Sequence, residues 1–462
     1  MKFFVDLLYL LTGLAISPMV LYRVIRHKRY RTGWEQRFGK IVRKNPKKKC
    51  IWLHAVSVGE VNAAKTVICE LENKFPDFEI VISTTTDTGF AQANNLFSKN
   101  LKVFYFPLDL SWVMRRAFSN ICPSICLLME LEVWPNFVQI AKQLNVPVIV
   151  INGRISDKSF SKYKKIKPIT KNIFRKVGLV LAQTEEYAKR FRELGCPDEK
   201  VIVTGSLKYD TAQITDKVED ADTLAAQLFA KSEIRNLKSE ILLWVAGATG
   251  DNEEQIILDV YGQLIRQKEL ADLRLAIVPR KPERFDEVAG LIKEKGFGLI
   301  RYSELKKKNP EKSSIEHRLS AEVSAKAEAS GIRSVILGDT MGDLRKFYSL
   351  ATVIFVGRSL VPMGGSDMME AAALGKCTIF GPHAFNFQQA VDALLTGNGA
   401  IMVKDKDDLL KTMQKCLLEP AYADKIARNG RDVIRKNQGA TTRTIQHITK
   451  FLSKSEYRNT KF

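Results

Sequence analysis

The residues best suited to chemistry form the segment His-Ala-Val-Ser-Val-Gly-Glu, which starts at His54 and ends at Glu60. An apolar run over residues 51–53 precedes it, and apolar residues at helical spacing follow from Val61. This order predicts a strand, a tight loop and a helix with Glu60 in its first turn. In open α/β sheets ligands bind at the carboxyl ends of strands. There Glu60 can take a proton from a hydroxyl, or it can simply favour the positive end of the helix dipole.

Other charged groups of the first half also follow apolar runs. Glu130 and Glu132 stand directly after Met129, before a Trp-Pro pair, which indicates either a second set of site acids or an ordinary helix start. Arg154 follows the next apolar run and can present a cation to the same crevice as Glu60. Lys208 lies where the first half ends.

The second half carries three loops that each follow a β-rich run, at residues 279–285, 338–344 and 357–370. Arg280 in the first loop has a guanidinium fork that matches phosphate oxygens. The glycine-bearing turn of the second can present backbone N–H groups to an anion. In the third, paired glycines let the backbone approach a ligand, and Glu370 can hold ribose hydroxyls. Glycine turns are common in α/β proteins, but three at successive strand ends of one domain favour a nucleotide site.

The elements that position these loops are β-rich runs alternating with helical stretches. This alternation predicts two doubly wound parallel sheets, in a first domain over residues 51–211 and a second over residues 241–430. A polar linker over residues 212–240 joins them, so that a cleft between the domains lets two substrates meet. The expected strands are residues 51–56, 79–83, 102–106, 125–128, 146–151, 179–182 and 201–203, then 241–246, 274–278, 298–300, 334–337, 352–356, 378–380 and 400–403.

Length and charge agree with two domains and an appendage. The 462 residues are too many for one core. The formal net charge of +21 gathers near the N-terminus, where residues 1–50 hold 13 Lys and Arg against two acids. Such a block favours an anionic partner, either a membrane surface or a nucleic acid. A generally basic composition is the alternative source for the charge elsewhere.

The apolar run over residues 3–22 is about long enough to cross a bilayer, although Asp6, Gly13 and Pro18 weaken it. Basic residues follow it, which places that side in the cytoplasm. We therefore expect a permanent anchor over residues 1–22, spanning or shallowly inserted, and a basic juxtamembrane segment over residues 23–50. A hydrophobic docking helix is the alternative.

The remaining features are a lysine-rich excursion from Lys306 and a C-terminal helix with a basic tail over residues 431–462. The seven cysteines include no Cys-x-x-Cys pair, and most of them, such as Cys69 and Cys377, are expected to be reduced core residues of a cytosolic domain. The five histidines lack metal-ligand spacing, so neither a bound metal nor a cofactor is expected.

Taken in order, the motifs resemble those of one family, the membrane-anchored lipid A 3-deoxy-D-manno-octulosonic acid (Kdo) transferases. The resemblance runs from the N-terminal anchor to about Val403. It implies the GT-B fold, with two Rossmann-like domains facing a cleft and an N-terminal membrane-anchor helix. The motifs that carry it are HAVSVGE, STTTDTGF, MELEVWPN, NGRISDKSF, TGSLKYD, VPRKPERF, LGDTMGDL, FVGRSLVPMGG and GPHAFNF.

The resemblance also implies a reaction, the transfer of Kdo from CMP-Kdo to a sugar hydroxyl of a lipid A precursor (lipid IVA), with inversion and without a metal. It implies a place at the inner membrane on anionic lipids, with the catalytic domains on the cytoplasmic side and no nucleic acid as partner. Glu60 would be the general base, and Glu130 and Lys208 would stabilise the transition state. The implied donor contacts are Pro279, Arg280, Met341, Gly342, Asp343, Asp367, Met368, Met369 and Glu370. The implied acceptor contacts are Ser57, Gly59 and Arg154.

The chain departs from the family pattern at a few positions. Lys281 stands where the family usually has His, Asp343 replaces a Glu, and Ser366-Asp367 begin a segment that usually reads His-Asn-Pro-Leu. Asp367 adds a negative charge near the CMP pocket, which would either weaken donor binding or alter the protonation there. The alternatives are a GT-B enzyme with another nucleotide sugar and a relative that binds lipid A without turnover. A membrane-tethered nucleic-acid-binding protein is disfavoured, because the basic block adjoins an apolar run rather than interleaved aromatics.

Overall fold

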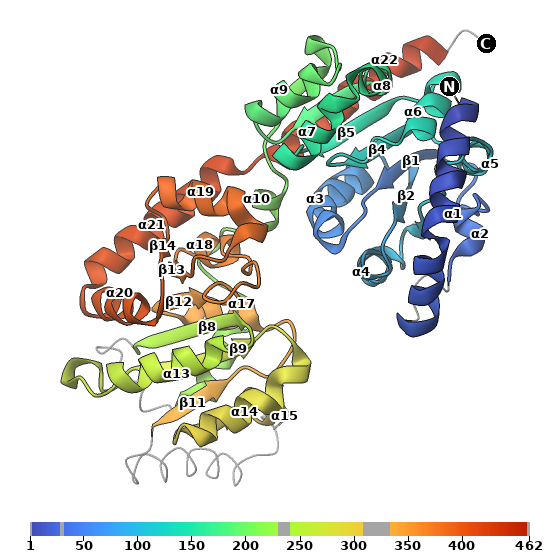
Figure 1. Cartoon of the computed structure of the whole chain (residues 1–462). Coiled ribbons are helices and arrows are strands. Elements are labelled where there is room, and N and C mark those ends of the chain that lie inside the picture. The colour runs from blue at the N-terminus through green and yellow to red at the C-terminus, as the bar shows by residue number, and fades with distance from the viewer. Residues whose placement is uncertain (1, 28–31, 230–240, 308–332, 460–462) are drawn as a thin grey trace. The chain divides into compact units, whose positions relative to one another are not determined.

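The computed structural model describes residues 2–27, 32–229, 241–307 and 333–459 (Figure 1). It divides into two compact units, one formed by Met1–Thr211 with Asn437–Phe462 and the other by Ala212–Lys436. Part of the basic cluster after the apolar run, the end of the expected linker and the excursion beyond residue 307 lie outside the described residues.

The first unit contains a seven-stranded, all-parallel sheet in the order β3-β2-β1-β4-β5-β6-β7. The direction of the strand order reverses between β1 and β4, which is the topological switch point where ligands of such sheets bind. The strands are β1 (Lys49–His54), β2 (Phe78–Thr84), β3 (Lys102–Tyr105), β4 (Ile125–Met129), β5 (Val148–Gly153), β6 (Leu179–Ala182) and β7 (Val201–Val203).

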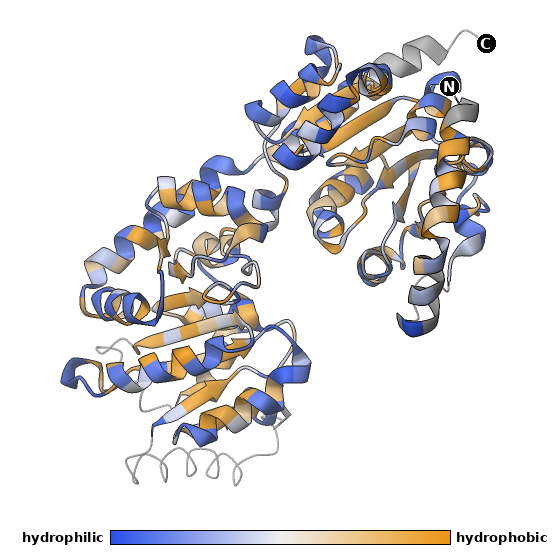
Figure 2. Ribbon diagram, viewed as in Figure 1, coloured by the Kyte–Doolittle hydropathy of each residue, from blue (hydrophilic) through white to orange (hydrophobic). Residues whose placement is uncertain are grey.

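Both faces of this sheet are buried, and the two-residue period of a strand explains how β1 serves both. Ile51 and Leu53 belong to the core cluster under α3 and α22. Cys50 and Trp52 point to the other face, where Trp52 packs among aromatic rings of the cluster under α5 and α6. Figure 2 shows the strands of both sheets as largely hydrophobic.

Helices cover both faces of this sheet. They are α1 (Lys2–His27), α2 (Trp34–Arg37), α3 (Val58–Lys74), α4 (Asp87–Phe97), α5 (Ser111–Ile121), α6 (Pro135–Gln143), α7 (Asp157–Lys165), α8 (Lys167–Phe174), α9 (Glu185–Glu193), the 3₁₀ turn η1 (Asp198–Lys200), α10 (Lys208–Thr211) and α22 (Ala440–Asn459).

The second unit contains another seven-stranded parallel sheet, in the order β10-β11-β9-β8-β12-β13-β14. Its switch point lies between β8 and β12. The strands are β8 (Leu243–Thr249), β9 (Arg274–Pro279), β10 (Gly298–Arg301), β11 (Ser334–Leu337), β12 (Val353–Val356), β13 (Cys377–Phe380) and β14 (Ile401–Met402). The helices are α11 (Ala221–Leu228), α13 (Glu253–Leu264), η2 (Lys268–Leu270), η3 (Pro282–Arg284), α14 (Phe285–Glu294), α15 (Tyr302–Lys307), α17 (Leu344–Leu350), α18 (Met369–Ala373), η4 (Phe385–Phe387), α19 (Gln388–Thr396), α20 (Lys406–Leu418) and α21 (Pro420–Asn437).

The expected doubly wound α/β architecture is confirmed for each unit. All fourteen strands expected from the sequence are present, with ends that shift by a few residues. All seven cysteines are free, and five are buried, but Cys69 is exposed, so the core position expected for it is wrong.

The expected N-terminal membrane span is not found. The apolar run does form a helix, α1, with Pro18 inside it. Among residues 2–27, 32–229, 241–307 and 333–459, however, no helix is both long enough and apolar enough to cross a membrane. Within α1, the Asp6 carboxylate accepts hydrogen bonds from the backbone N–H of Ser111 at 2.8 Å and the side chain of Asn136 at 2.8 Å.

The C-terminal helix α22 belongs to the first unit. Ile445, Ile448 and Leu452, spaced at helical intervals, are buried in the same cluster as β1. The Asp210 carboxylate on α10 binds the start of α22, because it accepts the backbone N–H of Gly439 at 2.7 Å and that of Thr441. This carboxylate therefore satisfies helix N–H groups that would otherwise lack partners.

Replacing Asp210 with Ala should loosen α22. A lost N-terminal cap weakens a helix by about 1–2 kcal/mol, which corresponds to a roughly 5–30-fold larger population of the open form. Hydrogen exchange of the α22 amides in the full chain measures this change. Asp198→Ala, which removes a carboxylate with 87% of its side chain exposed, is the matched control. Unchanged exchange in α22 of the Asp210 variant would contradict the capping role.

Candidate functional site

Glu60 folds back over the start of α3. Ser57 is the N-cap residue, and its Oγ accepts the Glu60 N–H at 3.4 Å and donates to Glu60 Oε1 at 2.9 Å. The backbone N–H of Val56 donates to Glu60 Oε2 at 2.9 Å. This arrangement resembles a capping box, with Ser and Glu three residues apart, but Glu60 accepts the N–H of the residue before the N-cap rather than that of the N-cap itself. Glu60 thus has the helix-stabilising role considered from the sequence, and its carboxylate is also held in one orientation at the carboxyl end of β1.

The pKa of Glu60 is raised to about 7. Burial is the largest cause, and the negative charges of Glu130 and Glu132 add to it, while the hydrogen bonds from Val56 and Ser57 oppose it. A carboxyl group with such a pKa is close to half ionised at neutral pH, which suits it to take and release a proton.

Glu130 and Glu132 lie just beyond β4, the neighbour of β1 across the switch point. Glu130 has a φ of 52°, a left-handed conformation that is uncommon for a residue other than glycine. Its N–H donates to Ile151 O at 3.0 Å. Glu132 accepts a hydrogen bond from Trp134 Nε1 at 2.9 Å, and burial raises its pKa. The structure thus brings Glu60 and the two acids beyond β4 into one electrostatic cluster.

His54, at the end of β1, was not assigned a role from the sequence. It is fully buried, and its Nδ1 lies 3.0 Å from both Ser83 O and Ser83 Oγ. Burial lowers the pKa of His54 to about 3, so the imidazole is neutral at physiological pH. Its Nε2 has no hydrogen-bond partner among the described residues and lies 3.9 Å from Glu132 Oε2. His54 therefore places an uncharged imidazole next to the Glu132 carboxylate.

The two cations predicted in the first unit are Arg154, directly after the end of β5, and Lys208, at the start of α10. Buried Asn152 connects these places, because its Oδ1 accepts the N–H of Leu207 at 3.0 Å. Arg154 and Lys208 are both partly exposed, and in the described parts of the chain neither pairs with a carboxylate. At the start of α3, a Cβ placed on Gly59 would meet only Ser57 Oγ, at 4.0 Å, which leaves open space there.

In the second unit, the two arginines of the first loop separate into different roles. Arg280 is exposed, and its backbone N–H donates to Thr249 O at 3.1 Å at the end of β8. Arg284 is buried and pairs with Asp251, Glu254 and Glu287, with Glu254 Oε1 at 2.7 Å. The guanidinium of Arg280 is therefore available to a ligand, and that of Arg284 stabilises the loop.

The second loop presents backbone and an apolar side chain rather than its acid. Gly342 has a φ of 91° with open space around it, and Met341 is 64% exposed. Asp343 is buried and accepts hydrogen bonds from Lys306 at 2.7 Å and Thr340 at 2.6 Å. Burial raises the pKa of Asp343, but these bonds and one from Lys346 outweigh it and lower the pKa overall. Asp343 thus holds the turn in place.

The third loop brings Glu370 toward two arginines. Burial and then the charge of Asp367 raise the pKa of Glu370, while Arg345 and Arg280 lower it. Arg345, which the sequence did not single out, lies 3.8 Å from the Glu370 carboxylate. Asp367 Oδ1 accepts the Met369 N–H at 2.9 Å at the start of α18. Pro279, Met368 and Met369 are buried beneath these polar groups.

Glu253 fixes the start of the third loop, a role that the sequence did not reveal. Its fully buried carboxylate accepts backbone N–H groups from Gly250 at 3.0 Å, Ser359 at 2.6 Å, Leu360 at 2.9 Å and Arg358. The paired glycines expected to admit a ligand instead approach the protein itself. A Cβ on Gly364 would lie 2.1 Å from the Asn386 side chain, and one on Gly365 would lie 2.9 Å from Ala384.

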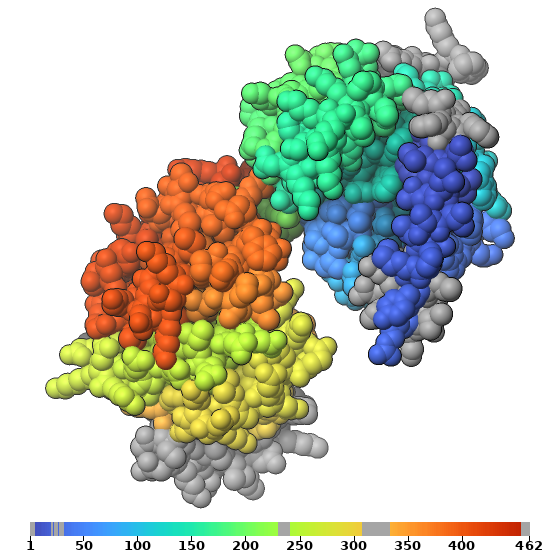
Figure 3. Space-filling view, in the orientation of Figure 1, coloured from blue at the N-terminus to red at the C-terminus, as the bar shows by residue number. Residues whose placement is uncertain are grey.

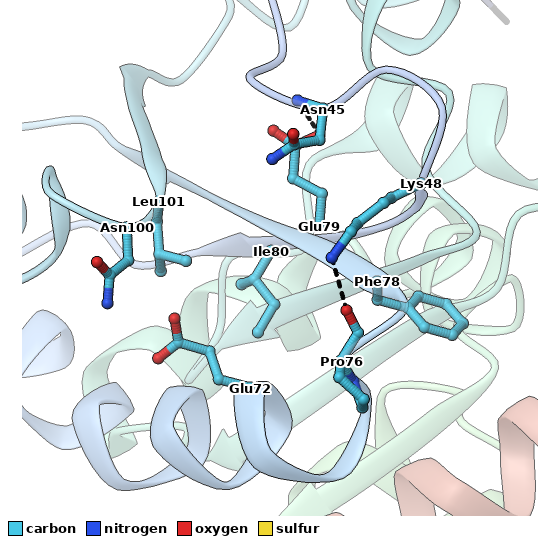
Figure 4. Close-up of a pocket in the computed structure, with 9 residues that line it drawn as sticks. All are labelled: Asn45, Lys48, Glu72, Pro76, Phe78, Glu79, Ile80, Asn100 and Leu101. Atoms are coloured by element: carbon cyan, nitrogen blue, oxygen red, sulfur yellow. Dashed lines mark hydrogen bonds between the residues drawn. The ribbon is translucent and has the colours of Figure 1, made fainter.

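A cavity of about 300 Å³ lies away from these residues, at the amino ends of β1 and β2 (Figure 4). Its wall includes Glu79, which Arg43 binds at 2.8 Å, and Lys48, which donates to Pro76 O at 2.7 Å. Because ligands of parallel sheets bind at the carboxyl ends, this cavity is not part of the candidate site. The described residues hold no cluster of three His, Cys, Asp or Glu that could bind a metal.

Comparison with known proteins supports the interpretation of the motifs. Residues 32–211 match the family described as 3-deoxy-D-manno-octulosonic-acid transferase (kdotransferase). The chain is 31% identical over 451 residues to a 3-deoxy-D-manno-octulosonic acid transferase of Haemophilus influenzae, covering 96% of this chain and 97% of the relative. It is 28% identical over 458 residues to a transferase of the same name from Bordetella pertussis, covering 96% and 99%.

Solved structures share the fold of the chain. A glycosyltransferase from Rickettsia africae matches with a TM-score of 0.53 at 14% identity, covering 88% of this chain and 99% of that one. A UDP-GlcNAc 2-epimerase from Neisseria meningitidis matches with a TM-score of 0.51 at 16% identity, covering 87% and 100%. These likenesses concern the fold alone, and the two parallel sheets fit the expected GT-B type.

The raised pKa of Glu60 predicts a pH-dependent effect on stability. The folded chain binds this proton more tightly than the unfolded chain, whose Glu has a pKa near 4.5. The free energy of unfolding therefore falls as the pH rises from about 4.5 to about 7. Glu60→Gln cannot lose that proton, so its melting temperature relative to wild type should be higher at pH 8 than at pH 5, by about 5–10 °C.

Differential scanning calorimetry at the two pH values measures this shift. Glu70→Gln, which changes an exposed carboxylate on the same helix, is the control and should show no such pH dependence. An equal melting difference at both pH values for Glu60→Gln would contradict the raised pKa.

Proposed function

The chain belongs to the 3-deoxy-D-manno-octulosonic acid (Kdo) transferase family and is therefore a glycosyltransferase, and we propose that it moves Kdo from CMP-Kdo to a sugar hydroxyl of a lipid A precursor, lipid IVA, in lipopolysaccharide biosynthesis. The observation that carries the mechanism is the Glu60 carboxylate. It is oriented by two hydrogen bonds, has a pKa of about 7 and lies at the switch point of the first unit.

Glu60 is the general base of this reaction. It takes the proton from the acceptor hydroxyl as the oxygen attacks the anomeric carbon of Kdo, and CMP leaves from the opposite face, so the configuration inverts. The open space over Gly59 admits the acceptor, and Ser57 and Arg154 bind it beside the base. Glu130 supports the positive charge that develops on the sugar ring, and Lys208 supports the negative charge that leaves with the donor.

The second unit binds the donor. Arg280, exposed and close to the end of β8, bonds the phosphate of CMP and stabilises the charge that gathers there as the bond breaks. The Met341-Gly342 turn presents backbone N–H groups to the nucleotide. Glu370 bonds the ribose hydroxyls, and Asp343, Asp367, Met368 and Met369 shape its pocket. Since Arg280 and N–H groups neutralise the phosphate, the reaction needs no bound metal.

We place the enzyme on the cytoplasmic side of the inner membrane, held by a shallowly inserted α1. Tyr9 on this helix donates to Asp109 at 3.0 Å, and Asp6 binds Ser111 and Asn136, so one side of α1 docks on α5 and α6. Figure 3 shows α1 along the surface of the first unit. The exposed apolar side chains on the helix are Leu7, Leu8, Leu10, Leu11, Leu14, Ile16, Met19 and Tyr22. A docked helix with such a face inserts into the interface rather than across the bilayer, beside the basic residues that favour anionic lipids.

The proposed role of Glu60 predicts that Glu60→Gln loses Kdo transfer by about 10²–10⁴-fold and keeps its affinity for CMP. Mass spectrometry of a tetraacylated lipid A precursor incubated with the protein and freshly generated CMP-Kdo detects each added Kdo unit. In wild type the rate should rise with pH through about 7, because the base must be ionised. A full rate in Glu60→Gln would refute the base, and an unmodified lipid with wild-type protein would refute the transferase reaction.

The proposed insertion predicts that the triple variant Leu7→Gln, Leu11→Gln, Leu14→Gln loses vesicle binding. These exposed side chains lie on one helical stripe, and each buried Leu contributes roughly 1.5 kcal/mol or more. Flotation with phosphatidylglycerol-containing vesicles should show at least a tenfold loss. Leu144→Gln with Leu418→Gln, two exposed leucines elsewhere, should float like wild type. Undiminished flotation of the triple variant would exclude the helix as the anchor.

A further inference from the structure

We propose that Arg358 binds the carboxylate of the sugar in the donor and so selects an acidic sugar over a neutral one. This inference rests on the proposed CMP-Kdo donor and adds a specificity residue that the family motifs did not assign. CMP-Kdo carries two anionic groups, the phosphate and the Kdo carboxylate. Arg280 serves the phosphate, which leaves the carboxylate without a partner.

Arg358 lies at the switch point of the second sheet. It follows β12, which pairs with β8 from Val353 opposite Trp244 to Val356 opposite Gly247. Arg280 lies on the other side of β8, with its backbone N–H on Thr249 O at 3.1 Å. The two arginines therefore flank the end of β8, where ligands of doubly wound sheets bind.

The residue that follows β8 is Gly250, and it lets Arg358 approach. A Cβ on Gly250 would lie 3.0 Å from Arg358 Cγ and 2.5 Å from Met363 Sδ. The stem of Arg358 thus packs over the backbone of this turn, while the residue as a whole stays partly exposed.

The backbone of Arg358 is strained. Its φ is 59°, a conformation that is unfavourable for a residue with a side chain and that glycine adopts freely. The surrounding contacts enforce it, because Glu253 accepts the Arg358 N–H and Gly365 N–H donates to Arg358 O at 2.7 Å. Strain that persists at a strand end beside a binding site indicates that the side chain has a function there.

The guanidinium of Arg358 lacks an acidic partner. It donates a hydrogen bond from Nη2 to Met363 O at 3.3 Å, and no carboxylate in the described parts of the chain pairs with it. By contrast, Arg284, Arg345 and Arg431 of the same unit each pair with one or more carboxylates. A guanidinium held by a single weak hydrogen bond can donate to both oxygens of a carboxylate. Arg358 is therefore suited to bind the carboxylate of the sugar acid.

The test compares Arg358→Gly with Arg280→Ala, using CMP and freshly generated CMP-Kdo as ligands without acceptor, together with calorimetric melting. Arg358→Gly should weaken CMP-Kdo binding about 10–100-fold and leave CMP binding unchanged, because CMP lacks the carboxylate. Its melting temperature should rise by about 2–4 °C as the backbone strain is relieved. Arg280→Ala should weaken both ligands, and Lys281→Ala, an exposed neighbour, should weaken neither.

Arg358→Lys keeps the backbone strain and the charge but not the fork, and its affinity for CMP-Kdo should fall between wild type and Arg358→Gly. Unchanged CMP-Kdo affinity in Arg358→Gly would overturn the inference. So would equal weakening of CMP and CMP-Kdo with a lower melting temperature, which marks a structural residue. Wild-type protein that binds CMP but neither binds CMP-Kdo nor transfers Kdo would refute the proposed function itself, and this inference with it.

Discussion

The parallel pairing of β1 with β4, and of β8 with β12, is the constraint on which both candidate sites depend. In each sheet the chain leaves these two neighbouring strands in opposite lateral directions, so their carboxyl ends stay uncovered by a crossover. Glu60 follows β1 and Glu130 follows β4, whereas Gly250 follows β8 and Arg358 lies just beyond β12. Because parallel strands share one direction, residues distant in the sequence reach the same edge without further interactions.

Several residues at these strand ends have an unusual backbone conformation. Glu130, Asn152, Ala248 and Arg358 all have positive φ without being glycine, and each lies at or just beyond the end of a central strand. Each such residue makes the fold less stable, so buried hydrogen bonds must enforce it. Asn152 holds the loop before Lys208, and Glu253 holds the loop that contains Arg358. The sites therefore depend on buried polar residues that do not contact a ligand.

The sequence predicted the sheets because apolar runs such as residues 51–53 and 125–129 are buried on both faces and end in polar loops. It located Glu60 and Arg280 because both follow such runs. It did not show that Asp343 turns inward, since that depends on Lys306 and Lys346 from other elements. It missed Glu253 because an acid in a first helical turn gives no sign that four loop N–H groups converge on it.

The structure differs from the sequence-based expectation in two further places, and both differences arise from contacts between residues far apart in the chain. The apolar residues of α22 were readable as one helical face, but their partner, the core around β1, lies almost the whole chain away. The apolar run of α1 predicted a membrane segment. Within it, however, Asp6 binds Ser111 at the start of α5, and Tyr9 binds Asp109 just before that helix. The Ser57-x-x-Glu60 spacing, by contrast, was a readable capping signal. This spacing does not reveal that the Glu60 carboxylate both stabilises the helix and serves as the proposed base.

The electrostatic coupling of Glu60 with its neighbours bears on how variants of Glu130 should be understood. The charge of Glu130 helps to raise the pKa of Glu60, so a neutral residue at 130 makes Glu60 a weaker base even if Glu130 never contacts the substrate. A lower rate in such a variant therefore combines two effects. They separate in the pH profile, because weaker basicity moves the acid limb to lower pH, whereas loss of transition-state stabilisation lowers the plateau and leaves the limb in place. The charge of Glu132, whose carboxylate lies 3.9 Å from His54 Nε2, raises the pKa of Glu60 in the same way.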